Sequence, residues 1–65
     1  MDTSHTDRLL PVADVCHQTT LSRAFIYDLV RRGEFPRPIK LSPNRVAWPQ
    51  TAVANWIATK IDQAA

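Results

Sequence analysis

Three hydrogen-bonding side chains recur at four-residue spacing in the middle of the chain. They are Arg23, Tyr27 and Arg31, and a helix would place all three along one face. Guanidinium and phenol groups on an exposed helix face can bind the phosphates and base edges of a nucleic acid. Each residue also has an ordinary structural alternative, either as a solvated arginine or as a tyrosine ring lying partly against the domain.

Other residues around this stripe are candidates for the same chemistry. Ser22 would cap the helix, whose first amide groups can also meet a phosphate. Arg45 is the strongest candidate for a phosphate contact outside the helix and Lys40 a weaker one, whereas Arg37 fits a contact or a solvated role equally well. The full set of predicted DNA-binding residues is Ser22, Arg23, Ala24, Tyr27, Asp28, Arg31, Arg37, Lys40, Asn44 and Arg45.

Positive charge is concentrated in the same part of the chain. The 65 residues include eight Lys or Arg and six Asp or Glu, which gives a net charge of +2. Six of the eight basic residues lie between positions 23 and 45, where only Asp28 and Glu34 oppose them. Such a local basic field accelerates association with polyanions. A solvated, solubilising face accounts for the charge equally well.

Other classes of function find little support in the sequence. So short a chain has no room for a deep catalytic cleft, and it contains no pairing of catalytic groups, so we expect no enzyme. His5 and His17 lack cysteine partners, and we expect neither a metal nor a cofactor. Cys16 is the sole cysteine and is predicted to be a small core residue. Without an apolar run or a signal peptide, we expect a cytoplasmic, nucleoid-associated protein without membrane contacts.

Two helices joined by a short connection must position the polar stripe. Apolar residues at i, i+3, i+4 and i+7 predict a first helix over residues 12–18. A second helix is predicted over residues 23–32, with Gly33 as its C-terminal cap. The connection is four residues long, which is typical of a helix-turn-helix, and its Leu21 should fill the core between the helices. The buried side of the second helix should hold Phe25, Ile26, Leu29 and Val30.

The second half of the chain predicts a hairpin and a third helix. Two prolines in residues 34–38 exclude a helix there. Strands are predicted over residues 38–41 and 45–48, because turn-forming residues separate them. A helix should follow from near Pro49 to about Asp62. Its buried stripe should comprise Val53, Trp56, Ile57 and Ile61.

The predicted fold is mainly α with a small β-hairpin, a winged helix-turn-helix of three helices plus a wing. Residues 8–10 could add a short strand. We expect a disordered N-terminal tail over residues 1–7, a DNA-binding domain over residues 8–62 and a C-terminal tail over residues 63–65. The hairpin would carry Asn44 and Arg45 at its tip.

Four segments of the chain are distinctive in combination. They are Leu-Ser-Arg-Ala-Phe-Ile-Tyr at 21–27, Gly-Glu-Phe-Pro-Arg-Pro-Ile-Lys-Leu at 33–41, Val-Ala-Trp at 46–48 and Val-Ala-Asn-Trp-Ile at 53–57. Together they resemble the AlpA family of small prophage-type transcriptional regulators and excisionases over roughly residues 8 to 61. The resemblance implies a MerR-like winged helix that binds double-stranded DNA near attachment or promoter sites of a mobile element. An integrase and neighbouring copies of the protein are the candidate protein partners.

Two residues depart from the family pattern. Thr20 stands where the family often has glycine, so the turn must avoid a left-handed conformation or accept strain. Asp28 stands where a basic residue is common, so it accepts from a cytosine amine, pairs with Arg31 or Arg32, or points away. The competing hypothesis for the whole chain is a protein-interaction module or antitoxin-like adaptor without direct DNA readout.

Overall fold

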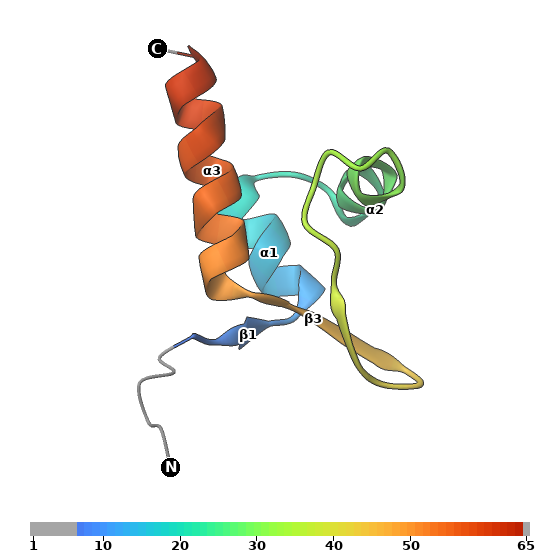
Figure 1. Cartoon of the computed structure of the whole chain (residues 1–65). Coiled ribbons are helices and arrows are strands. Elements are labelled where there is room, and N and C mark those ends of the chain that lie inside the picture. Colours follow the sequence, from blue (N-terminus) through green and yellow to red (C-terminus); the bar gives the residue numbers. More distant parts are fainter. Residues whose placement is uncertain (1–6, 65) are drawn as a thin grey trace.

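The computed structural model describes residues 7–64, so predictions for residues 1–6, His5 among them, and for residue 65 lie outside the described part. Three helices surround a small antiparallel sheet, which confirms the predicted winged helix-turn-helix class (Figure 1). The elements in chain order are β1 (Leu9–Leu10), α1 (Val12–Thr19), α2 (Arg23–Arg31), β2 (Ile39–Ser42), β3 (Arg45–Pro49) and α3 (Gln50–Ala64).

The sheet places the hairpin beside the helix-turn-helix. Its strand order is β1-β3-β2, so β3 is central and pairs with both neighbours. On the hairpin side Ile39 pairs with Ala47, and a register shift between Lys40 and Ser42 leaves Ser42 opposite Arg45. A shift of this kind bends the ribbon and increases its twist. The wing therefore projects from the body of the domain at the end away from α3 (Figure 1).

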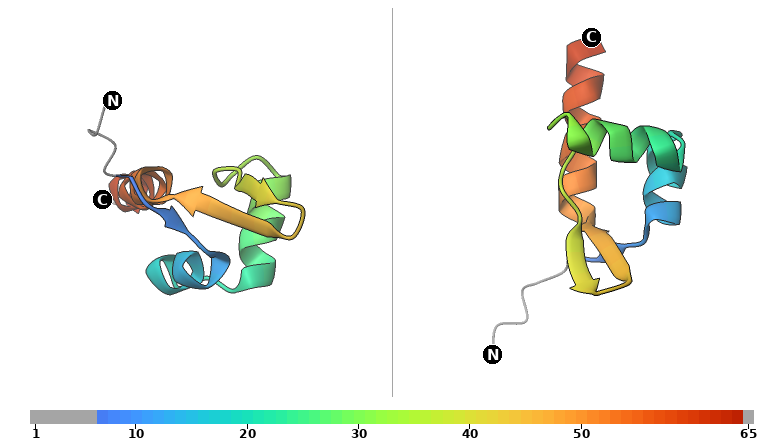
Figure 2. Two further views of the ribbon diagram at one scale, coloured as in Figure 1. Left: turned by 90° about the horizontal axis from the view of Figure 1, so that it is seen from below. Right: turned by 90° about the vertical axis from the view of Figure 1, so that its right-hand side faces the viewer.

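The core is built from apolar residues of all the principal elements. Val15 of α1, Ile26 of α2, Trp48 of β3 and Val53 of α3 are each fully buried and belong to one cluster. The amphipathic patterns of α1 and α2 thus meet over the inner face of β3, as the periodicity predicts. Residues 12–19 and 23–31 run across one another rather than side by side, which Figure 2 shows in its right-hand view.

Two tryptophans fix the proline-containing link between α2 and the wing. The indole Nε1 of Trp48 donates to the carbonyl oxygen of Pro36 at 2.8 Å, and that of Trp56 donates to the carbonyl oxygen of Glu34, also at 2.8 Å. Phe35 lies between them, with ring centroids 4.9 Å from Trp56 and 6.3 Å from Trp48. Edge-to-face aromatic contacts and hydrogen-bonded indole N–H groups hold a loop in one conformation. The link therefore sets the position of the wing relative to α2.

The turn between α1 and α2 contains a strained residue. Thr20 ends α1 with φ 64° and ψ 18°, and its amide donates to the carbonyl of Cys16 at 2.8 Å. The sequence left open whether this turn avoids the left-handed region, and the structure shows that it does not. A β-branched residue there is an outlier, because an L side chain in this region costs about 1–2 kcal/mol.

Replacing Thr20 by glycine should therefore stabilise the domain. We expect a gain of about 0.5–1 kcal/mol, since relief of strain exceeds the extra entropy of the unfolded glycine chain. In a domain of this size the melting temperature should rise by roughly 2–8 °C. Thermal denaturation followed by circular dichroism measures the shift. Thr20→Ala is the control, because it removes the hydroxyl but keeps the strain; an equal gain from alanine would contradict the explanation.

The N-terminus of α3 is capped from the far end of the chain. The carboxylate of Asp7 accepts from the backbone N–H of Thr51 at 3.0 Å and from the Thr51 hydroxyl at 2.6 Å. Asp7, the last residue of the predicted N-terminal tail, thus lies against the first turn of α3. These hydrogen bonds, the one from the Thr51 hydroxyl foremost, lower the pKa of Asp7 below its ordinary value.

This cap predicts a specific dependence of stability on pH. A carboxyl group whose pKa is depressed in the folded state stabilises the fold above its unfolded pKa, and the contribution is lost as the pH falls through the folded pKa. Asp7→Asn should therefore lower stability near neutral pH and reduce the further loss below about pH 4. Urea titrations at several pH values measure both effects. Asp14→Asn is a matched control on α1, and an equal effect from it would argue against the cap.

Three local expectations differ from the structure. Phe25 was expected in the core but is 44% exposed, and Ile61 was expected in the buried stripe of α3 but is 63% exposed. The third helix begins at Gln50, one residue after the proline, and continues through Gln63 and Ala64, which were assigned to the C-terminal tail. The last turns of α3 extend beyond the rest of the domain (Figure 1).

Candidate nucleic-acid interface

Helix α2 presents a polar face to solvent and an apolar face to the core. Ile26 is fully buried and Leu29 is 8% exposed, whereas Arg23, Ala24 and Arg31 are exposed. This is the division that the spacing of the sequence predicts. The nine residues of α2 span about 13 Å, comparable with the width of the DNA major groove.

Tyr27, in the middle of the polar stripe, is half-buried. Its ring packs edge-on against Trp48, with centroids 5.8 Å apart and planes at 60°. The structural alternative for this residue, a ring lying partly against the domain, therefore holds. The ring also lines a surface hollow between α2 and the wing. Packing against Trp48 therefore fixes the orientation of a side chain that borders solvent.

A surface hollow brings together residues from α2, the wing and the start of α1. We call it the helix–wing hollow; its volume is about 210 Å³. Two of its residues are arginines, one from the first turn of α2 and one from the wing, and its lining contains no carboxylate. The residues that line it are Pro11, Val12, Arg23, Tyr27, Asn44, Arg45 and Val46.

The helix–wing hollow unites four of the ten predicted site residues although they are up to 22 positions apart: Arg23, Tyr27, Asn44 and Arg45. Pro11, Val12 and Val46 were not predicted. Their side chains are apolar, so nothing in their types suggests binding. The assembled arrangement is a concave, positively charged surface with hydrogen-bond donors on two separate elements, which suits the binding of a polyanion.

Ser22 occupies the N-cap of α2. Its Oγ accepts a hydrogen bond from the backbone N–H of Phe25 at 3.1 Å. The capping role expected from the sequence is therefore present. The cap holds the first turn of α2 in place, and Arg23, the next residue, is positioned by it.

Asp28 pairs with both arginines at the end of α2. Its Oδ1 accepts from Arg31 Nη2 at 2.9 Å, and its Oδ2 accepts from Arg32 Nη2. Arg32 Nη1 also lies 4.0 Å from Glu34 Oε1. Of the three roles that the sequence left open for Asp28, the structure shows the pairing. Exposed pairs of this kind contribute about 0–1 kcal/mol each to stability.

The other predicted contacts lie outside the hollow. Arg37 is exposed in the link and Lys40 is exposed on the edge strand β2. Neither takes part in an ion pair with another residue in the range 7–64. Both remain candidates for backbone contacts beside the groove.

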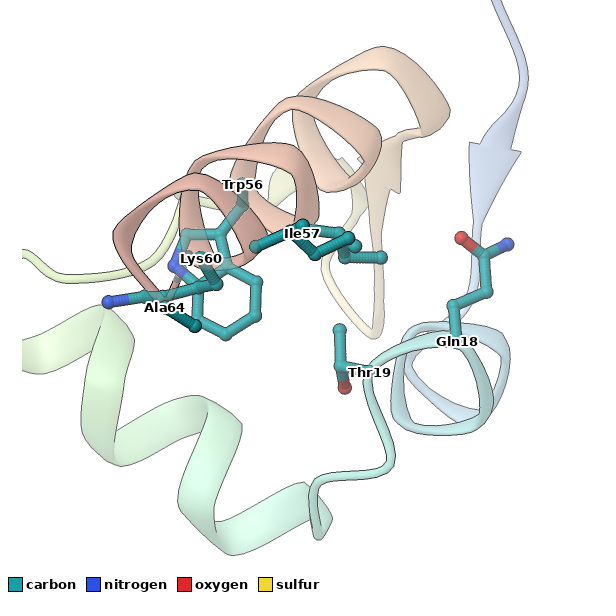
Figure 3. Close-up of a pocket in the computed structure, with 7 residues that line it drawn as sticks. Gln18, Thr19, Trp56, Ile57, Lys60 and Ala64 are labelled. Atoms are coloured by element: carbon teal, nitrogen blue, oxygen red, sulfur yellow. The ribbon is translucent and has the colours of Figure 1, made fainter.

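A larger hollow, of about 340 Å³, lies between the C-terminal part of α1 and the outer half of α3 (Figure 3). Its lining is mainly apolar, and Lys60, whose ammonium group lies 5.4 Å from the Trp56 ring centroid, supplies the charge. It shares no residue with the helix–wing hollow. The basic hollow and this mainly apolar hollow are therefore separate.

Comparison with known proteins places this geometry in a family. Residues 8–61 match the family model described as Prophage CP4-57 regulatory protein (AlpA). The chain belongs to the AlpA family. A relative from Enterobacteria phage P4, named Uncharacterized protein ORF88, is 44% identical over 55 residues, which are 85% of this chain and 62% of that protein. No solved structure matched the chain.

AlpA-family membership confirms the resemblance seen in the sequence and makes this chain a member of a prophage regulatory family. The matched range includes every residue of the helix–wing hollow. The chain spans less than two thirds of the length of its phage relative. Within residues 7–64 there is no helix with the length and apolar character needed to cross a lipid bilayer.

Proposed function

We propose that this chain is a sequence-specific DNA-binding regulator of a mobile genetic element. It inserts α2 into the major groove and places the hairpin of β2 and β3 against the adjacent phosphate backbone. The observation that supports this most directly is the convergence of Arg23 and Tyr27 from α2 with Asn44 and Arg45 from the wing around one hollow. All the residues of this hollow lie in the range that matches a family of prophage regulators.

The two parts of the surface have different tasks. Arg23, at the start of α2, reaches the base edges, where an arginine can bind guanine through two hydrogen bonds. Arg45, on the wing, binds phosphate and fixes the register of the helix in the groove. Ser22 and Ala24 flank Arg23; the short Ala24 side chain allows close approach of the helix to the groove floor.

One copy of so small a module binds DNA modestly. Single DNA-binding modules bury about 600–1,000 Å² of protein surface, so several copies on neighbouring sites would raise both affinity and specificity. Adjacent copies can also bend the duplex. A bent attachment site is what an integrase needs for excision, and we propose an integrase and neighbouring copies as partners in that role. Binding over a promoter would instead make the protein a transcriptional regulator of the element.

Selection from a random duplex library, followed by titration of the selected duplex over a salt series, tests DNA binding. We expect enrichment of a defined sequence and an affinity that falls as salt rises, because phosphate contacts release counterions. A protein-interaction adaptor would show neither effect. Footprinting then separates the roles: protection of attachment arms indicates an excisionase, and protection confined to a promoter indicates a transcriptional regulator.

A further inference from the structure

We propose that Asp28 holds Arg31 and Arg32 in ion pairs and so limits the number of phosphate contacts, and with it the affinity, that the end of α2 contributes to DNA binding. The inference rests on the proposed function. It assigns to Asp28 a role in setting affinity that differs from a direct contact with a base.

The ion pairs engage both oxygens of one carboxylate. Each oxygen of Asp28 accepts from a different guanidinium, with Arg31 Nη2 at 2.9 Å from Oδ1 and Arg32 Nη2 on Oδ2. Glu34 lies near the second arginine, 4.0 Å from its Nη1. Two carboxylates therefore balance two guanidinium groups at the C-terminal end of α2, and this end of the basic region carries no net charge.

The start of α2 and the wing are arranged differently. Arg23 and Arg45 form no ion pair with any other residue between positions 7 and 64. Their charges are fully available to a ligand at the helix–wing hollow. The protein thus has free arginines where a base edge and one phosphate would be contacted, and neutralised arginines more than two turns farther along, at the last residue and the C-cap of α2.

This distribution limits the electrostatic part of the affinity. Binding to DNA of arbitrary sequence depends on phosphate neutralisation, and each phosphate contact steepens the salt dependence by about 0.9 in the slope of log K against log salt. Withholding two arginines removes up to two such contacts. Because phosphate contacts carry no sequence information, the pairs should lower the affinity for all sequences alike.

The Asp28→Asn variant tests the proposal on the full chain. The ligand is a fluorescein-labelled duplex of mixed sequence, about 20 base pairs or two turns long. Fluorescence anisotropy between about 50 and 200 mM salt gives the slope. We expect tighter binding, a slope steeper by about 0.9 to 1.8, and a ratio of Kd values across this salt range that grows about 3.5- to 12-fold. The preference for a selected sequence over the mixed one should stay unchanged.

Matched variants separate this effect from a change in total charge or in folding. Asp62→Asn removes the same charge from an exposed position on α3 and should leave the slope nearly unchanged. Asp28→Glu should keep the wild-type slope. In an Arg31→Gln, Arg32→Gln background, Asp28→Asn should no longer steepen it.

Equal slopes for Asp28→Asn and Asp62→Asn would overturn the proposal while leaving salt-dependent DNA binding by the wild-type chain intact. Persistence of the Asp28→Asn effect in the double-arginine background would also overturn it. Absence of any salt-dependent binding by the wild-type chain would overturn both this proposal and the proposed function.

Discussion

Phe35→Ala is expected to cost about 3–5 kcal/mol of folding free energy. Phe35 is 5% exposed and its ring contacts both tryptophans that hydrogen-bond to the link. A domain of this length has a total stability of roughly 3–10 kcal/mol, so the variant should lose a large share of its stability. Urea titration followed by tryptophan fluorescence measures the loss.

The chain supplies a matched control for this prediction. Phe25 has the same side chain but is 44% exposed on α2, and Phe25→Ala should cost about 1 kcal/mol or less, because alanine is also the better helix former. Phe35→Leu keeps most of the apolar volume, so it should fold with a smaller loss and allow a midpoint to be measured. Equal losses for Phe35→Ala and Phe25→Ala would show that the aromatic cluster around the link is not central to stability.

Local periodicity was sufficient to predict the helices and the face of α2 that is buried. Ile26 and Leu29 lie in the middle of the apolar stripe, and any packing partner of α2 must cover them. Phe25 lies at the edge of the stripe, and whether an edge is covered depends on the shape of the partner element. The sequence pattern of one helix does not contain that information.

Interactions across the chain were beyond the reach of local patterns. Asp7 caps Thr51 from 44 positions away, and the indoles of Trp48 and Trp56 donate to carbonyls 12 and 22 positions away. Capping rules apply to residues within a few positions of a helix end, so no sequence motif predicted the Asp7 cap. The fold class was predictable, and the contacts that place the wing were not.

In the candidate site, too, the residues could be predicted from the sequence and their arrangement in space could not. The sequence predicted both Arg23 on the helix and Arg45 on the hairpin, but their proximity depends on the link, the tryptophans and the sheet register. The pairing of Asp28 with Arg31 and Arg32 was foreseen as one of three alternatives, because residues three and four apart on a helix are neighbours. Arg32 itself was not among the predicted site residues.

Arg23→Ala should weaken binding to the selected duplex by about 1–3 kcal/mol more than binding to a scrambled duplex, because a base contact is lost. Arg45→Ala should weaken binding to both duplexes alike and reduce the salt slope by about one unit, because a phosphate contact is lost. Both side chains line the helix–wing hollow. The two variants therefore remove the same charge from one site, but from different elements of it. Titrations of both duplexes over a salt series provide the measurement.

Arg8→Ala removes the same charge from an exposed position outside the hollow and should leave discrimination between the two duplexes unchanged. Thermal denaturation of each variant checks that the fold is intact, since surface substitutions usually change stability by less than about 0.5 kcal/mol. If Arg23→Ala weakens both duplexes equally, Arg23 contacts the backbone, and sequence discrimination must come from another residue of α2. If Arg8→Ala matches Arg45→Ala, the wing contributes only general charge, and the helix–wing hollow is not a phosphate-binding surface.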